Sequence, residues 1–222
     1  MSDSTAPGRR TFTKLLFALL FIVPILLLVK LAVEAKDRDP LSGTLDVQIL
    51  QWIHGFATPT LTQLVVHITN FGGPIAIVGI TAITAAILFF RNKRRAMTLL
   101  LIGVGGAGII NQLLKLSFQR IRPSLWAPVI TEHSFSFPSG HAMMSSALVF
   151  SLILLVWETK WRWYAVVIGL LYTLFIGFTR LYLGVHYPTD VLAGWLFSFV
   201  WLLTVRTILS RRQLRAAGQE LA

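Results

Sequence analysis

Two things are scarce in this sequence: cysteine, which is absent, and electric charge. Charged residues make up 13% of the 222 residues, and only 9 residues are acidic. Without cysteine the chain has no disulfide, no thiolate nucleophile and no cysteine-ligated zinc or iron–sulfur site. An ordinary soluble domain has roughly a quarter of its residues charged, whereas this chain is 55% hydrophobic. The composition therefore predicts a membrane protein.

The charges that are present are mostly positive. A formal net charge of +11 in a soluble protein suggests a nucleic-acid partner. Here the basic residues form short clusters between long apolar runs, which is the pattern that sets orientation in membrane proteins. We therefore expect the membrane bilayer, and no nucleic acid, as the partner.

Six apolar segments reach the length of roughly 17 to 25 residues that a helix needs to cross a bilayer. They lie near residues 15–33, 73–90, 97–116, 140–157, 163–179 and 190–209. Segment 41–71, between the first two, is interrupted by polar residues and is expected to form interfacial helices. The sequence thus predicts an all-α integral membrane protein with about six transmembrane helices in a single domain over residues 1–222. Its oligomeric state stays open.

The basic clusters fall on alternate connections between the predicted spans: Arg9, Arg10 and Lys14; residues 91–95; Lys160 and Arg162; and Arg211, Arg212 and Arg215. The positive-inside rule makes these connections and both termini cytoplasmic. Connections 34–72, 117–139 and 180–189 then face outward. Basic residues on the outward side stand against the rule and need another explanation, as do Lys115, Arg120, Arg122 and Arg180.

The first apolar segment has two interpretations. Its basic start, the run 15–29 and the small-residue site Val33-Glu34-Ala35 fit a cleavable signal peptide as well as a retained span. The orientation of the rest of the chain is the same in both cases.

Two patterns that resemble binding motifs are expected to be structural. Residues 103–108 match G-x-G-x-x-G, but they lie inside an apolar span without the strand that a dinucleotide site requires. Small residues in a span let neighbouring helices pack closely. His54, His67 and His133 each lack a second ligand at metal spacing, so no metal site is predicted.

Three polar patches on the outward side carry the candidate chemistry. In the first, residues 115–123, a spacing of seven places Lys115 and Arg122 nearly two helical turns apart on one face, and Pro123 is expected to end that helix. An ammonium and a planar guanidinium together suit an anion with several oxygens. Two basic side chains snorkelling at the end of a span would give the same pattern.

The second patch is Phe-Ser-Phe-Pro-Ser-Gly-His at residues 135–141. Pro138 is expected to begin the fourth span, whose free N–H groups and dipole form an anion site. Ser139 adds a hydroxyl donor, Gly140 lets the backbone approach closely, and His141 places an imidazole beside the bound group. Alone, the pattern also fits a helix start capped by Ser139.

The third patch runs from Thr179 and Arg180 to Asp190. Pro188 is expected to begin the last span, so that His186 precedes the helix and Asp190 lies in its first turn. A carboxylate four residues after a histidine can fix the imidazole tautomer and stabilise its cation, which suits a nucleophile. Asp190 alone would fit a favourable charge at a helix N-terminus.

Together these residues resemble the signature of the type 2 phosphatidic acid phosphatase superfamily, which includes bacterial phosphatidylglycerophosphate and undecaprenyl pyrophosphate phosphatases. That signature reads K-x6-R-P, P-S-G-H and S-R-x5-H-x3-D, and it lies here within residues 115–190. The only departure is Thr179 in place of serine, which keeps the hydroxyl. Residues 1–70 contribute no motif.

The resemblance implies a lipid phosphatase that works through a phosphohistidine, with no metal and no cofactor. His186, oriented by Asp190, would attack phosphorus, and His141 would protonate the leaving oxygen and then activate water. The phosphoryl oxygens would be held by Lys115, Arg122, Ser139, Gly140 and Arg180.

Other functions use some of the same features. Vanadium haloperoxidases share this anion pocket but are soluble, and a lipid phosphotransferase would use the same phosphohistidine. A lipid or phosphate transporter with a basic site near mid-membrane would not need these histidine and aspartate spacings. Among substrates, the excess of cations, with Arg120 as the extra one, favours undecaprenyl pyrophosphate over phosphatidylglycerophosphate or phosphatidic acid.

Overall fold

The computed structural model describes residues 7–36 and 45–219, and every regular element in them is helical. Residues 1–6, 37–44 and 220–222, on which the predicted termini and the start of segment 41–71 fall, lie outside the described residues. The elements are α1 (Pro7–Lys36), α2 (Leu45–His54), α3 (Pro59–Thr69), the 3-10 turn η1 (Asn70–Gly72), α4 (Pro74–Phe90), α5 (Arg94–Phe118), α6 (Gly140–Val156), α7 (Arg162–Tyr182) and α8 (Pro188–Gln219). The all-α prediction is confirmed.

A helix coincides with each of the six apolar segments, but the count of six spans is not confirmed. Four helices in the described part of the chain are long and apolar enough to cross a membrane, within α1, α5, α7 and α8. Helix α6 is apolar but shorter, and α4 reaches spanning length together with α3. Length and composition therefore give four or five candidate spans.

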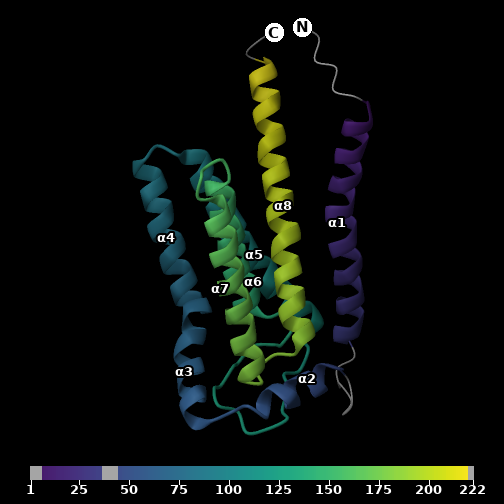
Figure 1. The fold of residues 1–222 in the computed structure, drawn as a ribbon, viewed down its shortest axis with the longest axis vertical. Helices are drawn as coiled ribbons and strands as arrows, with labels where there is room; N and C mark the ends of the chain where they lie inside the picture. The colour runs from purple at the N-terminus through teal and green to yellow at the C-terminus, as the bar shows by residue number, and fades with distance from the viewer. Residues whose placement is uncertain (1–6, 37–44, 220–222) are drawn as a thin grey trace.

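Segment 41–71 behaves differently in its two halves. Helix α2 lies across one end of the bundle (Figure 1), as expected of an interfacial helix. Helix α3 instead runs on toward α4, with a bend of 41° between them. The bend falls at Gly73 and Pro74, where a proline at the first helical position starts α4. The expectation that both helices are interfacial therefore does not describe α3 fully.

Helix α6 is the buried centre of the bundle, and glycines on α5 let α8 pack closely beside it. Ala142, Met143 and Ala147 are fully buried there. On α5, a methyl group added at Gly106 would lie 2.3 Å from the ring of Trp201, and one at Gly103 would lie 2.7 Å from Leu202. Gly103 and Gly106 of the run 103–108 thus let another helix pack closely, as predicted, whereas Gly105 has no neighbour within 4 Å.

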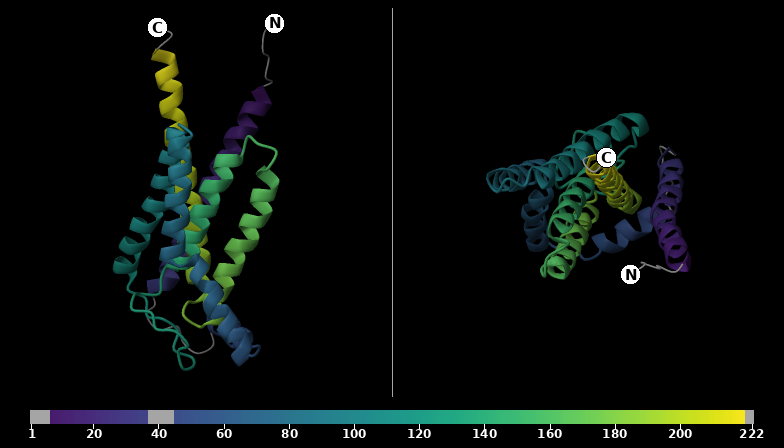
Figure 2. Two further views of the ribbon diagram at one scale, coloured as in Figure 1. Left: turned by 90° about the vertical axis from the view of Figure 1, so that its left-hand side faces the viewer. Right: turned by 90° about the horizontal axis from the view of Figure 1, so that it is seen from above.

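The two ends of the bundle differ in chemistry (Figures 1 and 2). Helix α1 begins and α8 ends at the same end as the short turns 91–93 and 157–161, where the basic clusters lie. The opposite end carries α2, the long loop 119–139 and the turn 183–187. At that end α1 packs against α8 through Leu28, Leu31 and Ala193. All three sequence motifs therefore meet at one end of the molecule.

Candidate active site

Lys115 and Arg122 of the first motif lie close together as predicted, but they do not lie on one helix. Helix α5 ends at Phe118 because Gln119 adopts a left-handed conformation with φ of 49°. Arg122 and Pro123 therefore lie in the loop, and the expectation of one helical face ended by Pro123 is wrong. The backbone N–H of Ser136 donates to the Arg120 carbonyl at 2.8 Å, which turns the loop back toward the helix.

Loop residues 134 and 135 hold Lys115 and Arg122 together. The Nζ of Lys115 donates to the Phe135 carbonyl, and at 3.2 Å to the Oγ of Ser134. Arg122 donates from Nη2 to the same Oγ at 3.2 Å and from Nε to the Ser134 carbonyl at 2.8 Å. The two cations are therefore neighbours at the wall of one cavity.

The second motif forms the start of α6, two residues later than predicted. Pro138 precedes Ser139, which is the N-cap residue, and the helix begins at Gly140. The Pro138 carbonyl is held by the Nδ2 of Asn111 at 3.2 Å. Ser139 makes no capping bond, and its buried hydroxyl has no partner among the described residues. That hydroxyl is available as a donor, which is what the anion-site interpretation requires.

The third motif places Arg180 in the last turn of α7 and His186 in the turn before α8. Helix α8 begins at Pro188 with Asp190 in its first turn, as predicted. Gly184 has a positive φ of 66°, and a methyl group there would lie 2.3 Å from the Trp126 ring. The turn that positions His186 therefore requires glycine at this point.

The buried imidazole of His186 is oriented by contacts on both ring nitrogens. Nε2 lies 3.0 Å from Nη1 of Arg122, and a guanidinium can only donate. Nε2 is thus the acceptor in the neutral ring, and Nδ1 carries the hydrogen. Nδ1 lies 3.4 Å from Oδ2 of Asp190 and 3.4 Å from the hydroxyl of Ser136. Burial, together with Arg122, Arg180 and Lys115, lowers the pKa of His186 well below 6.5.

Asp190 has three partners closer than His186, and the sequence analysis predicted none of them. Its Oδ2 accepts from the hydroxyl of Ser136 at 2.5 Å and from the backbone N–H of Tyr187 at 2.9 Å. Its Oδ1 accepts from Arg120 at 2.6 Å. Arg120 is 3% exposed and also pairs with Asp46. The expectation that Arg120 adds positive charge to the anion site is therefore wrong, because two carboxylates occupy its guanidinium.

Glu132 is the other residue that the sequence did not single out. Its carboxylate pairs with Arg180, and at 3.5 Å with Nη2 of Arg122. Burial raises the pKa of Glu132, but Arg180 and Arg122 outweigh burial and lower the pKa below 4.5.

Arg180 also donates to the Oγ1 of Thr69 at 2.9 Å. Thr179 shares that hydroxyl, at 3.0 Å, and bonds the Ile176 carbonyl, so its own hydroxyl is engaged within the helix packing.

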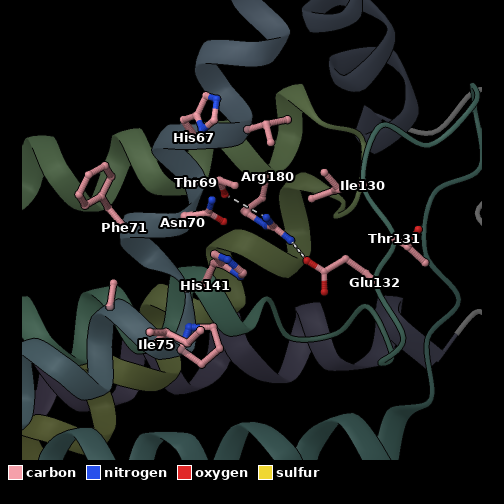
Figure 3. A pocket seen from close by; sticks show the side chains of 14 residues that line it. His67, Thr69, Asn70, Phe71, Ile75, Ile130, Thr131, Glu132, His141 and Arg180 are labelled. Atoms are coloured by element: carbon pink, nitrogen blue, oxygen red, sulfur yellow. Dashed lines mark hydrogen bonds and ion pairs between the residues drawn. The ribbon is translucent and has the colours of Figure 1, made fainter.

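Two cavities meet at His141, Glu132 and Pro74. The smaller, of about 290 Å³, is lined by five predicted site residues: Lys115, Arg122, Gly140, His141 and His186. The larger, of about 750 Å³, adds Arg180 and has apolar walls that include Phe71, Ile75 and Ile130. Figure 3 shows His141 and the Arg180–Glu132 pair facing this larger space. Ser139 and Asp190 are fully buried and line neither of the two cavities.

This arrangement can hold a tetrahedral oxyanion beside a neutral imidazole. Lys115, Arg122 and Arg180 supply three positive charges, and His141 lies between the small cavity and the apolar one. Such fixed cations stabilise charge that develops on phosphoryl oxygens.

The sequence did give one sign of Arg120, because this residue lies on the outward side against the positive-inside rule. Asp46 and Glu132 had no signal, because no spacing pattern includes them.

Comparison with known proteins gives a consistent result. Residues 96–214 match the PAP2 superfamily. Phosphatidylglycerophosphatase B of Bacillus subtilis is 32% identical over 154 residues, which cover 67% of this chain and 75% of the relative. The undecaprenyl-diphosphatase BcrC of the same organism is 34% identical over 164 residues, covering 70% of this chain and 80% of the relative.

A solved structure extends the likeness to the whole fold. The crystal structure of a transmembrane PAP2 type phosphatidylglycerolphosphate phosphatase from Bacillus subtilis superposes with a TM-score of 0.78 at 27% sequence identity. The superposition covers 87% of this chain and 97% of the other. The similarity therefore includes elements outside residues 96–214.

Proposed function

Because this chain belongs to the PAP2 superfamily, where its relatives include a phosphatidylglycerophosphatase and an undecaprenyl-diphosphatase, we propose that it hydrolyses a lipid phosphate through a phosphohistidine on His186. One observation carries the proposal. The neutral imidazole of His186 lines one cavity together with Lys115 and Arg122, and its Nε2 accepts from Arg122, a donor that a phosphoryl oxygen can take over. A nucleophile and the cations for its phosphoryl group thus share one space.

In the first step, Nε2 of His186 attacks phosphorus and the bond between phosphorus and the lipid oxygen breaks. His141 gives the leaving oxygen its proton, so a lipid alcohol leaves from a lipid monophosphate and a lipid monophosphate leaves from a lipid diphosphate. The ring becomes cationic, with its Nδ1–H directed to Asp190 and Ser136. The phosphoryl oxygens are held by Lys115, Arg122 and Arg180, with Ser139 and the Gly140 backbone N–H as further donors.

In the second step, water attacks phosphorus and the phosphorus–nitrogen bond breaks. His141, now neutral, takes the proton from that water, and inorganic phosphate is released. The charges that other phosphoryl-transfer enzymes obtain from magnesium are supplied here by side chains. We therefore expect no metal or cofactor requirement, and a chelator should leave turnover unchanged.

The leaving group is expected to be a membrane lipid. The larger cavity beside His141 has apolar walls, and Phe71 and Ile75 on them are exposed at 64% and 90%. A lipid tail fits such a surface better than a free sugar phosphate does.

The preference for undecaprenyl pyrophosphate rested on Arg120, and pairing of Arg120 with Asp46 and Asp190 removes that support. The proposal therefore covers lipid monophosphates and diphosphates together.

We place the proposed site on the outer face of the cell membrane. The basic clusters lie at the opposite end of the bundle, and the positive-inside rule assigns them to the cytoplasm. Both termini are then cytoplasmic, and residues 1–222 act as one transmembrane phosphatase domain.

The test is to trap the phosphohistidine. Purified protein in lipid–detergent micelles is mixed with a lipid phosphate labelled on phosphorus, and an alkaline quench preserves the labelled histidine. We expect label on the wild-type chain and none on His186→Ala, which should also lose hydrolysis. His141→Ala should slow both steps. Undiminished hydrolysis by His186→Ala would contradict the proposal, and label transferred to a lipid alcohol instead of water would favour the phosphotransferase alternative.

A further inference from the structure

Asp190 is the inner end of a longer row of charges. Its Oδ1 accepts from Nη1 of Arg120 at 2.6 Å, and Nη2 of Arg120 reaches Oδ2 of Asp46 at 3.2 Å. The Arg120 side chain is 3% exposed and that of Asp190 is 0% exposed. Water therefore screens these charges weakly. The row Asp190–Arg120–Asp46 connects the His186 site to helix α2.

Apolar packing fixes the outer end of this row. Val47 and Leu50 of α2 pack on Tyr187, the residue next to His186. The guanidinium of Arg120 lies 4.2 Å from the centre of the Tyr187 ring, within the range of a cation–π contact. Asp46 is therefore held at a defined place relative to the Asp190 carboxylate.

The sum of these charges has a chemical consequence. Arg120 cancels the charge of Asp190, and an isolated Asp190–Arg120 pair would offer no net negative charge to a cationic imidazole. Asp46 restores one net negative charge to the row. When His186 carries the phosphoryl group and becomes cationic, the row and the ring together are neutral.

We propose that Asp46 and Arg120 are positioning residues for the phosphohistidine step, Asp46 supplying the net negative charge that balances the His186 cation through Arg120 and Asp190. This inference rests on the function proposed above. It assigns a role to a residue outside 96–214, the part of the chain that matches the superfamily.

A purely structural role is the competing explanation. The Asp46 carboxylate accepts from the backbone N–H of Thr189 at 3.1 Å and from its hydroxyl at 2.5 Å, and so ties α2 to the first turn of α8. The two roles respond differently to charge. A structural tie is weakened further by each partner removed, whereas a charge balance is restored when a positive and a negative charge are removed together.

The experiment compares Asp46→Asn, Arg120→Gln and the double variant. Asparagine keeps the size of Asp46 and an acceptor for the Thr189 N–H. We expect Asp46→Asn to lower kcat by about ten- to a hundredfold, as loss of an outer partner of a catalytic group does. KM should stay near its wild-type value, because the cations of the anion site are untouched. The rate of phosphoenzyme formation should fall with kcat.

The double variant leaves Asp190 as the single negative charge, so it should form phosphoenzyme faster than Asp46→Asn does. Additive losses, or a kcat of Asp46→Asn within twofold of wild type, would overturn the inference. Glu34→Gln is the matched control, because Glu34 is a half-exposed carboxylate whose recorded pair is Lys30 on α1. If the Arg120 variants do not fold, Asp46→Glu replaces them: it keeps the charge and must retain more kcat than Asp46→Asn.

Failure of this inference and failure of the proposed function are distinguishable. Labelled His186 in the wild type, with full speed in Asp46→Asn, removes only the role of Asp46. Absence of labelled His186 in the wild type, with hydrolysis retained by His186→Ala, removes the phosphohistidine itself.

Discussion

Glu132 places a carboxylate among the cations proposed to bind the substrate phosphate. It pairs with Arg180 and Arg122, and it lines both cavities. Its lowered pKa keeps it ionised at neutral pH and down to below 4.5. A phosphoryl group that binds Arg180 and Arg122 must therefore compete with this carboxylate.

Glu132→Gln should strengthen anion binding. The amide is neutral and competes less for the two guanidinium groups, so vanadate, which mimics the phosphoryl group in transfer, should inhibit about tenfold more tightly, the effect of removing one charge-assisted contact. The measurement is the vanadate inhibition constant in micelles. Glu158→Gln, a change at an exposed glutamate in the turn between α6 and α7, is the control. Weaker inhibition in Glu132→Gln would mean that Glu132 holds the cations in place instead of competing for them.

His186 should remain neutral under mildly acidic conditions. Its pKa lies well below 6.5 because the ring is buried and faces Arg122, Arg180 and Lys115. Lowering the pH through 6.5 therefore leaves the nucleophile unprotonated. With nitrogen-labelled histidine, the NMR signals that His186→Ala removes should keep neutral Nδ1–H shifts from about pH 8 to about pH 5.5. Titration of those signals near pH 6.5 would show that burial and the neighbouring cations do not lower the pKa of His186.

The candidate site contains two kinds of residue: those that belong to a local sequence motif and those that only long-range contacts bring to the site. Six of the candidate residues stand in short spaced motifs, so the sequence alone was enough to predict them: Lys115, Arg122, His141, Arg180, His186 and Asp190. Asp46, Glu132 and Arg120 act through contacts across 74, 48 and 70 residues of chain. Spacing patterns describe neighbours along one helix or turn, so such distant ion pairs could not be predicted from one sequence.

At the scale of the elements, the close contact between α6 and α8 sets the geometry of the site. The backbone N–H of Ser139 donates to the Asp190 carbonyl at 3.0 Å. A methyl group at Gly194 would lie 2.9 Å from the Ser139 carbonyl oxygen and 3.1 Å from the Met143 nitrogen. These atoms belong to the backbone, so neither can move without shifting a helix.

Gly194→Ala should therefore separate α8 from the start of α6. We expect a loss of stability of about 1–3 kcal/mol from overpacking and a fall in kcat/KM of up to about a hundredfold from misplaced groups. Gly105→Ala, on α5, is the control, because nothing lies within 4 Å of the added methyl group and alanine favours a helix. Thermal unfolding and turnover in micelles measure both effects. Equal behaviour of the two variants would show that the α6–α8 contact tolerates movement.

Helix positions were predictable from the sequence, and helix ends were less so. The apolar runs located α1 and α4 to α8 because burial in lipid or in the bundle requires long apolar segments. The end of α5 depends on Gln119, which adopts a positive φ that glutamine rarely takes. The start of α6 depends on contacts of Pro138 and Ser139 with Asn111 and Asp190. Those contacts are tertiary, so proline placement alone gave the wrong first residue.

At the scale of the whole molecule, the two ends of the bundle are chemically unlike. One end has the turns 91–93 and 157–161 with exposed basic residues, and the other has the ion pairs of the candidate site. Cations at the first end have no recorded carboxylate partner among the described residues 18–36 and 45–211, whereas Arg120, Arg122 and Arg180 at the second end do. Lys and Arg in short connections keep a protein segment in the cytoplasm, and the ion pairs of the candidate site account for the basic residues at the second end.

This difference predicts the orientation, and single cysteines test it without background because the chain has none of its own. Cysteines at the exposed positions Ser124 and His133 should react with a membrane-impermeant maleimide on intact cells. Cysteines at the exposed positions Asn92 and Ser210 should react only after the membrane is permeabilised, because the basic end remains inside. Retained phosphatase activity in each variant confirms that it is folded. The reverse labelling pattern would place the site in the cytoplasm, where it would act on lipid phosphates of the inner leaflet.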